Sequence, residues 1–151
     1  MSFTYSFYGE LLSALLKTHQ PVTFPNLKGH DRPVFVLRHD IDYGLEFLGE
    51  MPEIEAELGI VATYFIQVGS LFYNPFAVDQ LRALERLKTL GHRFGLHSDS
   101  PDRTDADDLN RFIEWEKSVL SKTGVPIEAV SFHQPPAIVM DNEIKIKDIN
   151  T

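Results

Sequence analysis

The chain has 151 residues, a length that suits a single domain with a buried core. It carries 14 Lys and Arg against 22 Asp and Glu, and with a net charge of -8 it has no basic stripe to neutralise the phosphates of nucleic acid. The absence of Cys excludes disulfides, thiolate metal sites and thiol nucleophiles, so any metal must be held by His and carboxylates.

The N-terminal segment resembles neither a targeting signal nor a membrane anchor. It has no basic start, and the apolar run Leu11–Leu16 is too short to span a membrane. Apolar residues recur at helical spacing from Phe7 to Lys17, which predicts a covering helix, and Pro21 and Pro25 break the pattern. We expect a cytoplasmic protein without a membrane span.

Short apolar runs then alternate with amphipathic stretches. The predicted order is strand Val34–Leu37, helix Leu45–Leu58, strand Ile60–Ile66, helix Val78–Leu90, strand Arg93–Leu96, helix Ala106–Lys122 and strand Ala129–Phe132. Gly59, Gly91 and Gly124 each follow a predicted helix, where a left-handed residue is expected. Repeated strand-helix-strand units predict parallel strands joined by right-handed crossovers. The class is therefore α/β, barrel-like or open.

Two further features carry structural predictions. Trp115 lies beside the apolar stripe of the helix Ala106–Lys122, and we expect it to pack in the core. The segment Glu143–Ile149 alternates apolar and polar residues, as an exposed strand would.

The most informative stretch follows the first apolar strand and reads Arg38-His39-Asp40-Ile41-Asp42. Burying an unpaired charge is costly, so the two carboxylates need a partner, solvent or a metal. One explanation is metal-assisted hydrolysis. The alternative for Asp42 is that it caps the next helix, since Asp is a favoured N-cap residue.

Polar residues follow all four predicted strands. They are Arg38, His39, Asp40 and Asp42 after the first, Gln67 and Ser70 after the second, His97, Ser98 and Asp99 after the third, and His133 and Gln134 after the fourth. Ligands of parallel sheets and barrels bind at these carboxyl ends, so we expect one shared pocket. A divalent ion held by imidazole and carboxylate lowers the pKa of water to about 7 and polarises a carbonyl.

A lone His at a strand end is more often only hydrogen-bonded. His92, at the opposite end of its strand from His97, is expected to lie far from the site.

The ordered set of motifs resembles the polysaccharide deacetylases, the NodB-homology group of carbohydrate esterases. The stretch 38–42 resembles the first motif of that family, and the segment 62–69 resembles its second strand. The segment 91–98 is similar to the approach to the second motif, and 131–136 resembles the third. The likeness spans most of the chain, from Val34 to Pro136.

The resemblance implies roles for the matched residues. Asp40 corresponds to the general base, while Asp42 and His97 correspond to ligands of a divalent metal, most naturally zinc. The family places a further His ligand where this chain has Pro101, so Asp99 or His133 would have to replace it. His133 also stands where the family has an Arg that orients the base, and we expect it either to bind metal or to steady Asp40.

The family fold is a distorted (β/α) barrel with more strands than the four predicted here, and its late catalytic His is not found before Thr151. We therefore expect residues 1–151 to form one deacetylase-like domain with an incomplete or distorted barrel, lacking its C-terminal part. An open sheet edge is usually covered or paired. A homodimer contact through Ile144–Ile149 would cover it.

The implied function is removal of an acyl group, in particular N-acetyl, from a sugar. Arg38, His39 and Asp99 would support the site, and Tyr73 and Asn74 would contact the saccharide. The first motif, with Phe72-Tyr73-Asn74, resembles bacterial members linked to surface polysaccharide or O-antigen biosynthesis. The alternative is a sugar-binding or scaffold module that has lost the chemistry. A phosphoesterase is a third possibility, which the acidic surface disfavours.

Overall fold

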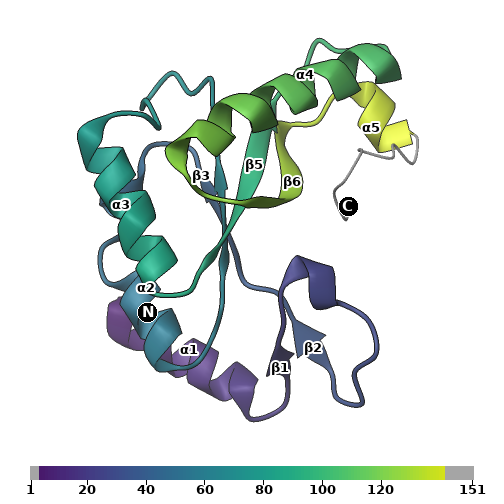
Figure 1. The fold of residues 1–151 in the computed structure, drawn as a ribbon. Helices are drawn as coiled ribbons and strands as arrows, with labels where there is room; N and C mark the ends of the chain where they lie inside the picture. Colours follow the sequence, from purple (N-terminus) through teal and green to yellow (C-terminus); the bar gives the residue numbers. More distant parts are fainter. Residues whose placement is uncertain (1–3, 142–151) are drawn as a thin grey trace.

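The computed structural model describes residues 4–141 (Figure 1). The elements run in the order α1 (Tyr5–Leu16), β1 (Gln20–Pro21), η1 (Phe24–Asn26), β2 (Val34–Phe35), β3 (Arg38–Ile41), η2 (Leu45–Leu48), α2 (Met51–Glu57), β4 (Thr63–Ile66), α3 (Val78–Thr89), β5 (Arg93–Asp99), α4 (Ala106–Leu120), η3 (Ser121–Thr123), β6 (Ile127–Gln134) and α5 (Ala137–Asp141), where η denotes a 3₁₀ helix. Strands and helices alternate from β3 onward, which confirms the predicted α/β class.

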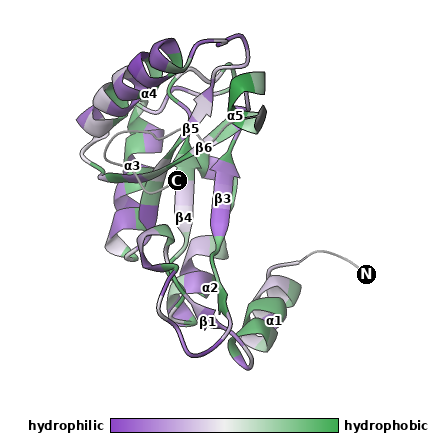
Figure 2. Cartoon of the chain, turned by 90° about the vertical axis from the view of Figure 1, so that its right-hand side faces the viewer, coloured by the Kyte–Doolittle hydropathy of each residue, from purple (hydrophilic) through white to green (hydrophobic). Residues whose placement is uncertain are grey.

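Four parallel strands form the main sheet, in the order β3-β4-β5-β6. Each strand lies beside the next one in sequence, with helices in the connections. The first predicted strand, Val34–Leu37, is wrong: Val34–Phe35 is β2, which pairs with β1 outside this sheet, and the sheet strand is Arg38–Ile41. Two of its four residues, Arg38 and Asp40, are exposed, so their charges are not buried in apolar surroundings. Figure 2 shows β3 as a hydrophilic strand.

Alternation along the strands gives the sheet two faces with different side chains. Ile41, Ile66 and Leu96 stand in register and belong to the main core, together with Leu84 of α3 and Ile113 of α4. The other face carries Asp40, Phe65 and Gly95, also in register. Within residues 4–141 the strands form this open sheet and no closed barrel.

A buried polar cluster joins the first helix to the sheet. Glu55 of α2 is fully buried and accepts hydrogen bonds from the hydroxyls of Tyr8, at 2.6 Å, and Tyr64, at 2.7 Å. Nε2 of His39 lies 2.7 Å from the same carboxylate, and its ring stacks on Tyr64 with centroids 4.7 Å apart. These contacts connect α1, α2, β3 and β4 through a single carboxylate.

Gly59, Gly91 and Gly124 have φ angles of 71°, 86° and 82°, which confirms the predicted left-handed positions after helices. The predicted helix Leu45–Leu58 is instead split into η2 and α2, because Gly49 between them has a φ of 57° and Pro52 lies in the first turn of α2. Pro lacks the N–H group that a continuing helix needs, but it is tolerated at a helix start.

Trp115 is 53% exposed and stacks on Phe112 at the surface of α4, so its predicted core position is wrong. No helix among residues 4–141 is long and apolar enough to cross a membrane. The predicted strand Glu143–Ile149 and the dimer contact through Ile144–Ile149 lie outside the described residues.

Candidate metal centre

Three side chains from different strands converge at the carboxyl end of the sheet. Asp42 directly follows β3, His97 lies in β5 and His133 in β6. Oδ1 of Asp42 lies 3.4 Å from Nε2 of His97 and 3.0 Å from Nδ1 of His133. The imidazole rings are nearly perpendicular, with centroids 5.3 Å apart. One ligand atom from each residue falls within 4.8 Å of the others. The structure thus brings together the three residues predicted to bind metal.

Neighbouring side chains orient this cluster. His97 and Ser131 are register partners across β5 and β6, and Nδ1 of His97 lies 2.7 Å from Oγ of Ser131. The amide of Gln67 donates to Oδ1 of Asp42 at 3.4 Å. Because Ser131 engages one ring nitrogen, the other is directed at Asp42. Sequence reasoning did not assign a role to Ser131; its position two residues before His133, on the same face of a strand, was the available signal.

Burial lowers the pKa of His97, although the nearby carboxylates of Asp40 and Asp42 act in the opposite direction. The neutral imidazole is the form that binds metal. His97 is almost fully buried, whereas Asp42 and His133 are partly open to solvent. The cluster is therefore open to solvent on the side of Asp42 and His133.

The donor set fits a zinc-like ion. Ligands about 2.0–2.2 Å from a tetrahedral ion lie roughly 3.3–3.6 Å from one another. The separations of 3.4 Å and 3.0 Å in the cluster are close to this range. The contact of His97 with Ser131 is of the kind that orients metal-binding imidazoles through their second nitrogen. Two imidazoles and one carboxylate leave a tetrahedral position for water or substrate.

The helix-cap explanation for Asp42 is wrong. The residue before η2 is Gly44, and no side chain caps that helix. The carboxylate of Asp42 instead contacts Gln67, His97 and His133.

Asp40 forms a bidentate pair with Arg38. Nε of Arg38 donates to Oδ1 at 3.1 Å, and a terminal guanidinium nitrogen donates to Oδ2 at 2.6 Å. The guanidinium also lies 5.1 Å from the centroid of the Phe65 ring. His133 contacts Asp42, and Arg38 is the residue that holds Asp40. Positions two apart in a strand lie on the same face, so the spacing of Arg38 and Asp40 in the sequence was a signal for this pair.

Four other predicted site residues lie apart from the cluster. His39 faces the helices and pairs with Glu55, and Asp99 is outside the group of converging ligands. The Tyr73 hydroxyl donates to the carbonyl of Ile41 at 2.9 Å and accepts from the backbone N–H of Gln67 at 2.8 Å. Oδ1 of Asn74 accepts from the N–H of Phe76 within its own turn. His92, as expected, lies elsewhere, with Nε2 3.0 Å from the carbonyl of Pro52.

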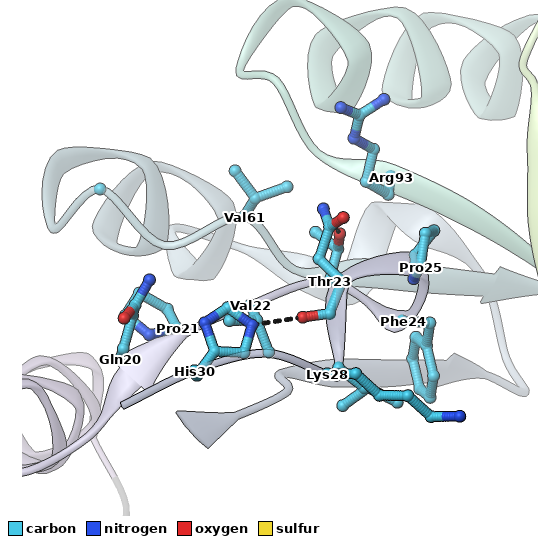
Figure 3. Close-up of a pocket in the computed structure, with 13 residues that line it drawn as sticks. Gln20, Pro21, Val22, Thr23, Phe24, Pro25, Lys28, His30, Val61 and Arg93 are labelled. Atoms are coloured by element: carbon cyan, nitrogen blue, oxygen red, sulfur yellow. Dashed lines mark hydrogen bonds between the residues drawn. The ribbon is translucent and has the colours of Figure 1, made fainter. Parts of the chain in front are cut away.

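A cavity of about 720 Å³ lies at the opposite end of the strands, between the segment 20–30 and the residues Gly59, Val61 and Arg93 (Figure 3). Its lining includes no carboxylate and only one imidazole, that of His30. The ligand chemistry is therefore concentrated at the carboxyl ends of the strands, and this cavity is separate from it.

The sequence matches no protein-family profile and no curated protein. Among solved structures, it is similar to the Streptococcus pyogenes deacetylase PplD in complex with acetate, with a TM-score of 0.61 and 17% identity over 83% of this chain. The chain spans 60% of the length of that deacetylase. A chitin deacetylase from Colletotrichum lindemuthianum aligns over 58% of this chain and 39% of its own, with 17% identity and a TM-score of 0.46. The similarity to PplD confirms the expected deacetylase likeness at the level of the fold.

Proposed function

We propose that this chain acts as a metal-dependent deacetylase that removes an acyl group, in particular N-acetyl, from a sugar of a bacterial surface polysaccharide. The observation that carries the proposal is the convergence of Asp42, His97 and His133 from three strands, at the end of the sheet where Asp40 also lies. The fold shared with a deacetylase supports the same chemistry.

Asp42, His97 and His133 would hold the ion. A zinc-like ion at such a site lowers the pKa of water and polarises a carbonyl. Asp40 would accept a proton from the attacking water, and the bidentate contact with Arg38 holds its carboxylate in one orientation. General base catalysis typically contributes about 10²–10⁴-fold. Arg38 takes the place of the Arg that the resemblance expected at the position of His133.

A second candidate is a sugar-binding module on the same fold without catalysis. The observation that favours it is Pro101, which stands where the resemblance expects another His ligand. Metal content separates the two candidates, because only the enzyme needs an ion. A chain that binds saccharide and no divalent ion would be such a module.

The first test measures binding of Zn²⁺ to chelator-treated protein by calorimetry. We expect one ion per chain, and Asp42→Asn should weaken binding by more than about 100-fold, because even loss of an outer partner of a ligand costs about 10–100-fold. Asp99→Asn is the matched control, since Asp99 is the alternative ligand that lies outside the cluster. Equal affinity in the wild type and Asp42→Asn would contradict the assigned centre.

The same protein, loaded with Zn²⁺, is then assayed for acetate release from an N-acetylated oligosaccharide. Asp40→Asn should abolish release while it leaves Zn²⁺ binding intact, because Asp40 is assigned to proton transfer. Full activity in Asp40→Asn would show that the proposed base is wrong.

A further inference from the structure

Tyr43 and Phe72 present two aromatic rings to solvent, in two segments that meet at the backbone of Asp42. Tyr43 is 63% exposed and Phe72 is 66% exposed, and their ring centroids are 4.7 Å apart. Leu71, next to Phe72, is 96% exposed. Large apolar groups normally gain by leaving water, so adjacent exposed apolar groups often mark a binding surface.

Hydrogen bonds fix this pair to the segment that carries Asp42. Tyr43 directly follows Asp42 in the chain. The hydroxyl of Ser70 donates to the carbonyl of Asp42 at 3.2 Å and accepts from the N–H of Phe72 at 3.1 Å. Tyr73 extends the same connection through the carbonyl of Ile41. These bonds hold the backbone of Phe72 close to that of Asp42, and the two rings contact each other, which reduces the entropic cost of ordering them on binding.

The chemistry of the surface suits a neutral sugar ring. A pyranose presents one face of C–H groups edged by hydroxyls, and such a face can lie on the electron-rich face of an aromatic ring. Neither ring carries a formal charge, and the net charge of -8 disfavours an anionic ligand.

The size of the surface also favours a saccharide over a protein partner. An aromatic side chain buries about 150–250 Å² at most, so two rings supply roughly 300–500 Å². A stable protein interface buries about 800 Å² on each partner. Two rings are enough for one or two sugar units.

We propose that Tyr43 and Phe72 form a stacking platform for a neutral pyranose ring of an N-acylated oligosaccharide, directly beside the candidate metal centre. The inference rests on the proposed function, since it names the neighbouring part of the same substrate. It makes the protein selective for a sugar chain over a single sugar.

The test titrates the N-acetylglucosamine tetrasaccharide into metal-free protein by calorimetry. Tyr43→Ala and Phe72→Ala should each raise the Kd about three- to tenfold, as expected for loss of one aromatic contact. Phe72→Tyr keeps a ring and should restore the wild-type Kd. Trp115→Ala is the matched control, because Trp115 is also exposed and stacked on a neighbour, but on α4.

An unchanged Kd in both alanine variants would overturn the inference, as would a wild type that does not bind the tetrasaccharide. Self-association of the wild type that Phe72→Ala abolishes in sedimentation would also overturn it, since the rings would then join two copies. Zn²⁺ affinity measured in parallel separates the two proposals. If the centre fails, Zn²⁺ is not bound but the Kd still depends on both rings; if the platform fails, Zn²⁺ is bound and the Kd is insensitive to them.

Discussion

The pKa values of two buried glutamates in this fold are shifted in opposite directions. Burial alone would raise the pKa of Glu55, but His39 and the hydroxyls of Tyr8 and Tyr64 outweigh it, so the pKa lies below its ordinary value. At Glu116 burial dominates, because the hydroxyl of Ser98 at 2.6 Å is the main stabilising contact, and the pKa rises to about 7. The number and charge of the donors decide the direction.

The raised pKa of Glu116 predicts a pH dependence of stability. The folded chain binds this proton more tightly than the unfolded chain, so its contribution falls as pH rises from about 4.5 to about 7 and then levels off. Glu116→Gln cannot ionise and should lack this loss. Relative to the wild type, the variant should gain up to about 3 kcal/mol between pH 4.5 and pH 8.

The measurement is urea unfolding of the wild type and the Glu116→Gln variant across this range. Glu114→Gln, an exposed change on the same helix, is the control and should keep the wild-type profile. Parallel profiles for the wild type and Glu116→Gln would show that the Glu116 carboxyl does not titrate as proposed.

At the residue scale, the sequence predicted the three converging side chains better than their neighbours. Asp42, His97 and His133 could be named because each lies at the end of a predicted strand. His39 was grouped with them by proximity in sequence, yet it points to the opposite face, and Arg38 was not recognised as the partner of Asp40. Choosing the face of a strand requires knowing where that strand begins, and the predicted first strand was misplaced.

At the element scale, β5 shows how a missing side chain shapes the site. A Cβ on Gly95 would lie 2.4 Å from the ring of Phe65 and 3.1 Å from the carbonyl oxygen of Ala129. Phe65 in turn lies edge-on to Phe24 and beneath Arg38, which holds Asp40. Gly95 therefore leaves the space that the Phe65 ring and its neighbours occupy.

Gly95→Ala should destabilise the fold by about 1–3 kcal/mol, because the extra methyl group overpacks the sheet. Urea unfolding gives the size of the effect. Gly69→Ala is the control, since no atom lies within 4 Å of the point that an added methyl group would occupy, and it should be neutral or slightly stabilising. A Gly95→Ala protein as stable as the wild type would show that Phe65 moves aside without cost.

Helix–strand alternation and the glycine helix ends were predictable because they depend on local pattern and backbone conformation. The separation of β2 from β3 was not predictable. Val34–Phe35 pairs with β1, whereas the strand that follows pairs with β4, so one apolar run covers parts of the chain with different partners. Pairing is a long-range property. The break at Gly49 was predictable, because Gly49 and Pro52 both lie inside the helical pattern and both disfavour a continuous helix.

At the scale of the whole molecule, Glu55 connects parts that are distant in sequence. Tyr8 on α1 reaches it from 47 residues away, and the sheet contacts it through His39 and Tyr64. Removing one partner of a buried carboxylate is costly, because the remaining groups stay buried without their hydrogen bonds or opposite charge. The cluster is therefore expected to make α1 unfold together with the sheet.

Glu55→Gln should lower the free energy of unfolding by about 2–4 kcal/mol, because the amide cannot replace the charge opposite His39. Because the pKa of Glu55 is lowered, its contribution is present above its ordinary pKa and is lost as pH falls through the folded value, so the cost should shrink in acid. Denaturant unfolding measures it, with exposed Glu57→Gln as control. Equal effects of the two substitutions would contradict a special role for Glu55.

The fold class and the likeness to deacetylases were predictable from the order of motifs, and the open sheet agrees with the expected incomplete barrel. The contacts of Phe24 and Arg38 with Phe65 on the second face of the sheet were not predictable, because they join segments that are distant in sequence. The exposed position of Trp115 was missed for the same reason.

The positions of Asp42 and His133 have a mechanical consequence. They follow or lie in β3 and β6, the two outer strands of the sheet, which in a flat sheet would be about 14 Å apart. Their ligand atoms are nevertheless 3.0 Å apart. The turn after β3 and the two side chains therefore reach across the strands between them, and an ion held there would connect the two margins of the sheet. Ion affinity and the distance between these margins would then be linked: a change that separates Asp42 from His133 would weaken ion binding, and a bound ion would resist that separation.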